Sequence, residues 1–235
     1  ILIIIYIIAQ DMSNTNLINT EIFKQSWNLL EGKWTNVISF IIVYYVIQLV
    51  SEEIILFFSN DDFSFNSIIL LIISYCFSML LQIGLYKFFL NVARNENYNF
   101  EDLWFGFKGK HIHKRIGAMV LSSIIILIGL FIFIIPGIFF AVRLCLVPFF
   151  LADKKELSVL DTLDLSYNTT RGKEWKILVF FLKSIIILAL GFLCLLVGFL
   201  WAFPCVMTSF SIFFDNLCNA PSKIMDSNED IYENS

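Results

Sequence analysis

The sequence predicts an all-α fold: a polytopic membrane helical bundle of about six transmembrane helices, in three repeats of an amphipathic helix plus a transmembrane hairpin. Of its 235 residues, 58% are hydrophobic and 15% are charged, and the mean hydropathy is +0.79. Soluble domains average about 45–50% apolar and about 25% charged residues. The apolar residues form long runs, and a Gly-Lys pair stands just before such a run at three places. These observations indicate that lipid surrounds most of the chain.

The apolar runs divide into six predicted spans of about the 20 residues that cross a bilayer. The run at 116–151 has 36 residues with one charge and a Pro-Gly pair at 136–137. It is too long for one span and fits two short ones joined by a tight turn, because proline interrupts helical hydrogen bonding. The run at 177–217 is likewise too long for one span and contains a proline, Pro204. The predicted helices cover 36–57, 67–93, 115–134, 137–152, 176–199 and 202–218.

The three Gly-Lys pairs lie within the motifs EGKW, KGKH and RGKEW, and a short amphipathic segment precedes each of them. We expect each segment to be a helix lying flat on the membrane that ends at a glycine in the left-handed conformation. These glycines are Gly32, Gly109 and Gly172. The following lysine is expected to reach lipid phosphates, and a tryptophan to lie at the headgroup level. The predicted interfacial residues are Lys33, Trp34, Lys110, Lys173 and Trp175. The side chains expected to face acyl chains are Trp27, Trp104 and Leu163.

Each predicted repeat ends in a Phe-Phe pair with Asn or Asp close behind, within YKFFLNVA, VPFFLAD and SIFFDNL. The first phenylalanine follows the Gly-Lys lysine by 55, 39 and 40 residues in the three units. The first unit is longer because it carries a loop between its two spans. The recurring order of these features predicts an internal repeat.

Lys and Arg are distributed unequally between the two ends of the predicted hairpins. The connections at 59–67, 135–137 and 200–203 contain neither residue, whereas the opposite connections are rich in both. The positive-inside rule therefore predicts that both termini are cytoplasmic. The predicted units are a non-native or disordered segment at 1–19, a single membrane domain at 20–218 and a disordered acidic tail at 219–235.

Arg143 is the charge most suggestive of function, because it lies inside a predicted span. A charge near a helix centre costs at least about 2.5–3.5 kcal/mol on insertion scales, so it must snorkel, pair or line a wet cavity. Its candidate partners are Asp215, Glu52 and Glu53. A proline inside an apolar run, such as Pro136, can also leave backbone carbonyls without a helical hydrogen bond and so available to a ligand. The candidate functional residues in the membrane are Arg143, Asp215, Pro136 and Gly137, and a purely structural role for Arg143 is an equally open alternative.

The sequence predicts no catalytic, cofactor or metal site. His111 and His113 are the only histidines, and no further ligand stands at a suitable spacing. The five cysteines lack CxxC spacing and are interpreted as small buried hydrophobes. The Gly-Lys pairs lack the strand, the glycine-rich loop and the Ser or Thr of a nucleotide-binding P-loop. The predicted partners are the lipid bilayer and a lipid or small anionic ligand, with no nucleic acid.

A family resemblance is carried by three stretches: GLYKFFLNVARNENYNFEDLWFGFK, IIPGIFFAVRLCLVPFFLAD and LDLSYNTTRGKEWKI. Together they resemble the membrane domain of glycerophosphoryl diester phosphodiesterases and its uncharacterised bacterial integral-membrane relatives. The resemblance covers about residues 20–218. It implies a polytopic protein of the bacterial inner membrane. In some members this domain is fused to a soluble phosphodiesterase, for which this chain has no room, so hydrolase activity is not expected.

Two function classes follow from these observations. The first is a non-enzymatic membrane protein that handles a lipid or solute or acts as a scaffold. The alternative is a membrane-embedded enzyme acting on lipid headgroups. The missing catalytic motifs favour the first class, whereas loss of one lipid species in a deletion strain would favour the second.

Overall fold

A computed structural model describes residues 21–58, 65–153, 157–193 and 197–219. Within these ranges the chain is all-α and contains no strand, as predicted. The predicted N-terminal segment and most of the acidic tail lie outside the described residues.

Six segments of the described chain are long and apolar enough to cross a membrane, which confirms the predicted number. Five of them each lie in one helix, and the fourth, at 134–153, combines two short helices, α5 and α6. The helices involved are α2 (Trp34–Phe58), α3 (Phe65–Ala93), α4 (Ile112–Ile132), α5 (Ile134–Leu144), α6 (Val147–Asp153), α8 (Glu174–Leu193) and α9 (Val197–Asn219).

The chain turns between α4 and α5 at Phe133, whose backbone is extended, and not at the Pro-Gly pair. Pro136 lies in the first turn of α5, where a backbone N–H has no intrahelical acceptor and its absence costs little. The predicted turn position was therefore wrong by a few residues. A second break separates α5 from α6, and Pro148 explains it because proline cannot donate the hydrogen bond that would continue the helix.

The three Gly-Lys corners have the predicted backbone. Gly32, Gly109 and Gly172 have φ values of +79°, +105° and +74°, which place them in the left-handed region. A helix over residues 21–30, the 3₁₀ helix η1 (Phe100–Phe107) and α7 (Val159–Thr170) precede these glycines. The repeat is therefore visible in the structure, although its second amphipathic segment is a 3₁₀ helix and not an α-helix.

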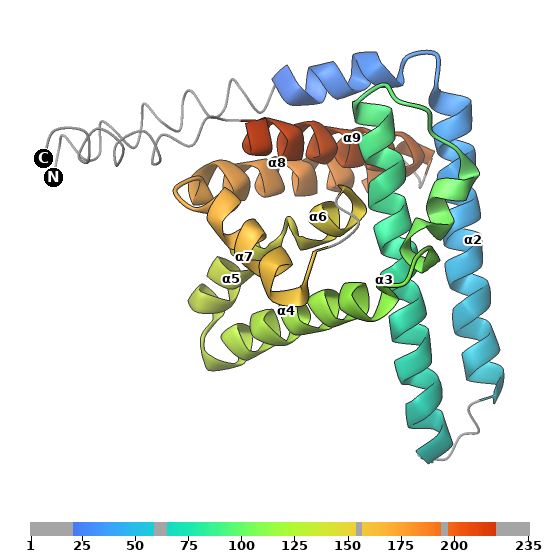
Figure 1. Cartoon of the computed structure of the whole chain (residues 1–235). Coiled ribbons are helices and arrows are strands. Elements are labelled where there is room, and N and C mark those ends of the chain that lie inside the picture. Colours follow the sequence, from blue (N-terminus) through green and yellow to red (C-terminus); the bar gives the residue numbers. More distant parts are fainter. Residues whose placement is uncertain (1–20, 59–64, 154–156, 194–196, 220–235) are drawn as a thin grey trace, which may run out of the picture.

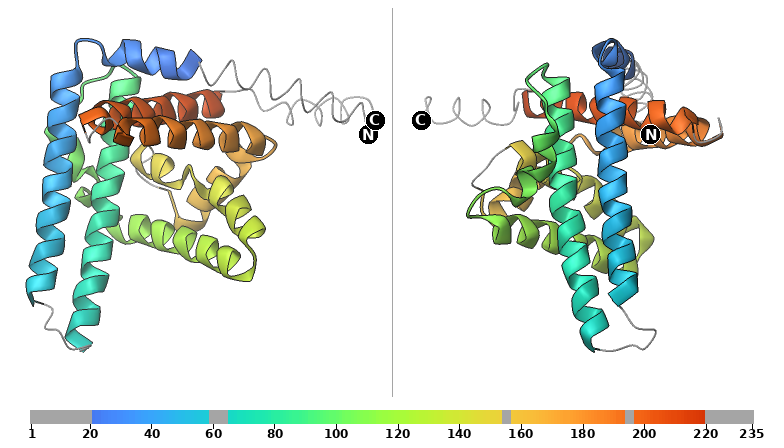
Figure 2. Two further views of the ribbon diagram at one scale, coloured as in Figure 1. Left: turned by 180° about the vertical axis from the view of Figure 1, so that it is seen from behind. Right: turned by 90° about the vertical axis from the view of Figure 1, so that its right-hand side faces the viewer.

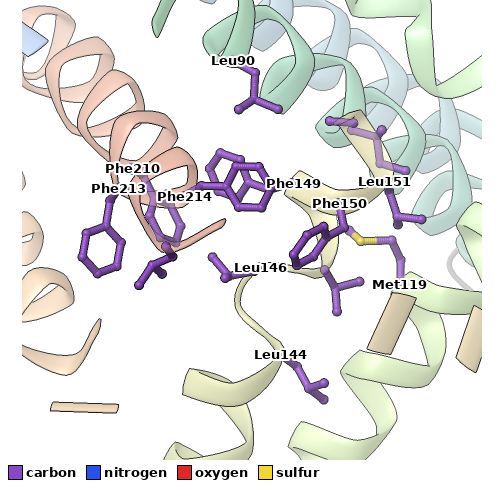
Figure 3. Close-up of a cluster of buried hydrophobic side chains, with 14 of the residues drawn as sticks. Leu90, Met119, Leu144, Leu146, Phe149, Phe150, Leu151, Phe210, Phe213 and Phe214 are labelled. Carbon is purple, nitrogen blue, oxygen red and sulfur yellow. The ribbon is translucent and has the colours of Figure 1, made fainter. Parts of the chain in front are cut away.

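The Phe-Phe pairs of the three units are all buried, the first in one core cluster and the second and third together in another. All six rings are at most 4% exposed: Phe88, Phe89, Phe149, Phe150, Phe213 and Phe214. Figure 3 shows the pairs of the second and third units approaching each other, and the Phe149 and Phe214 rings stack with centroids 5.1 Å apart. The motif that ends each repeat is thus buried, and it packs the second hairpin against the third.

The hairpins do not run parallel to one another. In Figures 1 and 2, α2 and α3 lie side by side and extend well beyond the other helices, while the α8–α9 hairpin runs across them. η1 packs closely along α3 because two glycines permit it: a Cβ on Gly84 would lie 2.1 Å from the Leu103 carbonyl oxygen, and one on Gly106 would lie 2.0 Å from the Leu80 oxygen.

Large apolar side chains are exposed along every hairpin. They are most exposed far from the Phe-Phe core, as at Phe57 (82%), Phe131 (94%) and Leu193 (77%). A soluble protein rarely leaves such continuous apolar surface in water. The chain is therefore a multi-pass membrane protein whose hairpins present apolar surface to the bilayer.

Candidate functional site

Arg143 lies in the last turn of α5 and is 5% exposed. Its guanidinium forms an ion pair with Glu174 and donates a hydrogen bond from Nη1 to the Tyr167 carbonyl at 3.2 Å. The rings of Tyr167 and Phe139 also face it, with centroids 4.5 and 5.0 Å from Cζ. A charge within the apolar part of the fold is thus matched by a carboxylate, a carbonyl and two aromatic rings.

Helix α7 holds this arrangement in place. Ser166 and Thr170 donate hydrogen bonds to the Arg143 carbonyl at 2.8 and 3.3 Å, and both side chains are fully buried. Tyr167 lies between them in the sequence and supplies its carbonyl and ring. The polar face of α7 therefore binds the backbone and the side chain of one arginine, which fixes α5 against α7.

Glu174 was not among the predicted partners of Arg143. It is the first residue of α8, and its Oε1 also accepts a hydrogen bond from the Gly172 N–H at 3.2 Å. A carboxylate at a helix N-terminus is favoured by the helix dipole. The residue within RGKEW that sequence reasoning passed over thus links the third corner to the arginine.

Asp215 instead belongs to a second ionic cluster, with Arg94 and Asp153. Arg94 forms ion pairs with both carboxylates, and its Nη2 lies 2.7 Å from Asp215 Oδ1. The hydrogen bond to Asp215 is the largest cause that raises the pKa of Arg94, and the hydrogen bond to Asp153 adds to it. Each hairpin contributes one of these charges within five residues of its Phe-Phe pair. The cluster therefore ties the ends of the three units together.

Pro136 and Gly137 lie beside a groove between α4 and α5. The groove has a volume of about 220 Å³, and its walls are almost entirely apolar. Its lining residues are Ile125, Ile128, Gly129, Ile132, Pro136 and Phe140. Gly137 itself is buried against α4, since a Cβ there would lie 2.6 Å from the Leu130 Cα. Proline thus forms part of a groove wall, while the glycine allows the two helices to approach.

The predicted interfacial lysines differ in what they contact. Lys33 Nζ donates to Asn95 Oδ1 at 2.6 Å, and Lys173 Nζ donates to the Leu217 carbonyl at 3.0 Å. Both lysines thus reach the chain end of their own hairpin, while Lys110 is exposed. Of the two tryptophans, Trp175 is 61% exposed. Trp34 is less exposed and contacts the Trp27 ring, with centroids 4.9 Å apart.

The amphipathic segments pack against other helices of the protein, whereas the sequence predicted that their apolar faces contact lipid. Leu163 is only 8% exposed and packs in the hydrophobic core, so the prediction that it faces acyl chains was wrong. The reason is that α7 packs over α4, α5 and α6. In the first segment, Ser26 is buried and accepts a hydrogen bond from Ser209 of α9 at 2.7 Å. Trp27 and Trp104, at 50% and 44% exposure, remain available to lipid.

Arg115 is a buried arginine that sequence reasoning treated only as part of the basic loop. Its Nη1 donates to the carbonyls of Phe105, Gly106 and Lys108 at 2.7–3.0 Å. These carbonyls lie at the C-terminal end of η1, where backbone acceptors lack the full set of helical partners, and the Phe105 carbonyl also accepts from the Lys108 N–H at 3.2 Å. A basic residue following a short helix was the available signal, and its role here is to bind the end of η1.

The described residues contain no group of three or more His, Cys, Asp or Glu side chains placed to hold a metal ion. The cysteines within the described ranges are free thiols. Comparisons with protein-family models, with curated proteins and with solved structures give no match.

Proposed function

We propose that this chain is a non-enzymatic lipid-handling protein of the bacterial inner membrane, with both termini in the cytoplasm. Its kinship with the membrane domain of glycerophosphoryl diester phosphodiesterases is part of the same proposal and rests on the three sequence stretches given above. The lipid bilayer is its primary partner.

The observation that carries lipid handling is the apolar groove between α4 and α5. Ile128 and Ile132 line the groove and are 55% and 59% exposed. The groove is therefore open on the apolar surface that the hairpin presents to the bilayer. Its volume of about 220 Å³ is below the roughly 300–1,000 Å³ typical of sites for drug-sized ligands. A segment of one acyl chain fits these properties better than a polar solute does.

The ionic groups support a non-enzymatic role. Arg143, Arg94 and Arg115 each bind groups of the fold, through Glu174, two aspartates and three backbone carbonyls respectively. A catalytic acid, base or anion-binding group needs an arrangement in which substrate can reach it. These three arginines instead bind groups of the fold and hold its helices together.

Photocrosslinking tests the groove. We expect a photoreactive residue at Ile128 to form adducts with an intact phospholipid that persist through detergent exchange. The matched control is Ile124, on the same helix and 45% exposed but outside the groove. Equal retention at both positions would show that the groove holds no lipid, and an adduct with another polypeptide would favour a scaffold.

Cysteine accessibility tests the orientation. In a background without the native cysteines, an impermeant thiol reagent applied to intact cells should label a cysteine at Ser59 and leave one at Ser222 unlabelled. Labelling at Ser222 would contradict the cytoplasmic position of the C-terminus.

A further inference from the structure

The third Gly-Lys corner, at residues 171–176, combines three cations with an exposed aromatic ring. The cations are Arg171, Lys173 and Lys176, and the ring is Trp175, which is 61% exposed. The one acid in this stretch, Glu174, pairs with the buried Arg143. Since the charge of Glu174 is paired within the fold, the corner keeps a surplus of positive charge.

Local geometry separates the acid from the cations. Gly172 at φ +74° reverses the chain between α7 and α8, and its N–H binds Glu174 Oε1 at 3.2 Å. Lys173 lies beside the end of α9, where Nζ donates to the Leu217 carbonyl. Burial is the main cause that lowers the pKa of Lys173; Cys218 raises it, and the charge of Lys176 lowers it. Lys173 and Lys176 therefore lie close enough for their charges to repel each other, and an anion bound beside both would reduce that repulsion.

The other two corners differ from the third in this respect. Lys33 of the first corner binds Asn95 and lies over the Tyr98 ring, with Nζ 5.7 Å from the centroid. In the second corner Lys108 pairs with Glu101 at 3.6 Å and Lys110 is exposed, but the corner lacks the tryptophan found after the lysine in the other two. None of the three cations of the third corner forms an ion pair with any residue that the structure describes.

We propose that residues 171–176 form a binding site for the phosphodiester headgroup of an anionic phospholipid, with Arg171, Lys173 and Lys176 around the phosphate and Trp175 beside the upper acyl chain. This proposal rests on the membrane location proposed above and names the lipid class that the protein prefers. The exposed tryptophan favours a lipid over free phosphate, because tryptophan partitions to the headgroup region of a bilayer.

The expected preference follows from the number of cations. A Lys or Arg near an anionic membrane surface contributes about 1 kcal/mol, which corresponds to about a fivefold change in binding. Lys173 and Lys176 together should therefore produce a preference of at least about fivefold for an anionic over a zwitterionic lipid at this corner.

The test places a photoreactive aromatic residue at Trp175 in the full chain, reconstituted in vesicles with equal amounts of phosphatidylglycerol and phosphatidylcholine. We expect phosphatidylglycerol adducts to prevail at Trp175 and a smaller preference with the same residue at Trp34. The Lys173→Gln/Lys176→Gln variant should lose most of the preference at Trp175, because only Arg171 remains of the three cations. The control variant, Lys24→Gln/Lys108→Gln, removes the same net charge and should keep it.

Salt offers a second measurement that needs no substitution of the lysines. Raising ionic strength to 1 M shortens the Debye length to about 3 Å, so the preference at Trp175 should fall. Adducts with both lipids in equal amounts would overturn this site and leave the membrane proposal intact, whereas absence of lipid adducts at both tryptophans would contradict the membrane proposal itself. A separate comparison at low ionic strength adds inorganic phosphate or chloride at equal ionic strength. If phosphate abolishes the preference and chloride does not, the assignment to a lipid is overturned.

Discussion

Exchange of Glu174 for glutamine removes the carboxylate that pairs with Arg143 and leaves the guanidinium buried. Removing one partner of a fully buried pair costs about 3–5 kcal/mol, whereas exposed pairs contribute at most about 1 kcal/mol. The Arg143 side chain is 6% exposed and the Glu174 side chain is 33% exposed, so the pair lies between these limits. We expect Glu174→Gln to lower the free energy of unfolding by about 2 kcal/mol.

Exchange of Arg143 for lysine keeps the charge but changes its shape. The bond from Nη1 to the Tyr167 carbonyl is lost, and so is the flat cation that faces the Tyr167 and Phe139 rings. A hydrogen bond from a charged group is worth about 1.5–3 kcal/mol, and lysine can recover part of it. We expect a loss of about 2 kcal/mol in the free energy of unfolding. The exposed Arg171→Lys is the matched control and should change it by less than about 0.5 kcal/mol.

The measurement is reversible unfolding by SDS in mixed micelles, with Arg143→Gln, Glu174→Gln and the double variant forming a double-mutant cycle. Coupled buried partners show interaction energies of about 0.5–3 kcal/mol. A coupling near zero, or a silent Arg143→Lys, would refute the conclusion that Arg143 is held by Glu174 and the aromatic rings. Growth of a deletion strain complemented with Arg143→Leu then separates a structural role of Arg143 from a functional one. Full complementation would mean that the charge has no function.

Two further predictions concern contacts that join the repeats. Arg94→Gln leaves Asp153 and Asp215 close together without their shared cation. The three side chains are about one quarter exposed, so we expect about 1–2 kcal/mol of destabilisation in the same unfolding assay, with partial rescue by Arg94→Lys. An unchanged unfolding midpoint would mean that the cluster does not tie the hairpins together. Gly84→Ala places a methyl group 2.1 Å from a backbone carbonyl of η1 and should cost about 1–3 kcal/mol or prevent folding. Gly117→Ala, whose nearest neighbour is a side-chain methyl at 3.1 Å, should cost less, and equal effects of the two glycine variants would contradict the close packing of η1 on α3.

The corners and spans could be predicted because they depend on neighbours in the sequence. A run of about 20 apolar residues has few alternatives to a span, since backbone groups in lipid must be hydrogen-bonded internally. Likewise, a glycine that follows an amphipathic helix and precedes a new span is expected to adopt a left-handed conformation, and Gly32, Gly109 and Gly172 do so. The position of the turn at Phe133 was missed because proline is tolerated in the first turn of a helix, so the Pro-Gly pair did not mark the boundary.

The partners of the buried charges could not be predicted in the same way. Glu174 and Arg143 are 31 residues apart and meet only because α7 folds over α5 and returns the chain to it. Asp215 was a reasonable candidate for Arg143 on charge alone, but the packing of α9 against α3 brings it to Arg94 instead. Leu163 shows the same limit, because an apolar face has the same periodicity whether it covers lipid or protein.

The sequence by itself determined that this chain is an all-α membrane protein with six spans and three Gly-Lys corners, because composition, hydrophobic length and glycine positions are local properties. Only the tertiary structure decided which side chains pair, where the groove between α4 and α5 lies, and that Glu174 reaches Arg143 while Lys173 reaches the end of α9. These outcomes depend on how helices that are distant in the sequence pack against one another, and the hydrophobic pattern does not encode that arrangement.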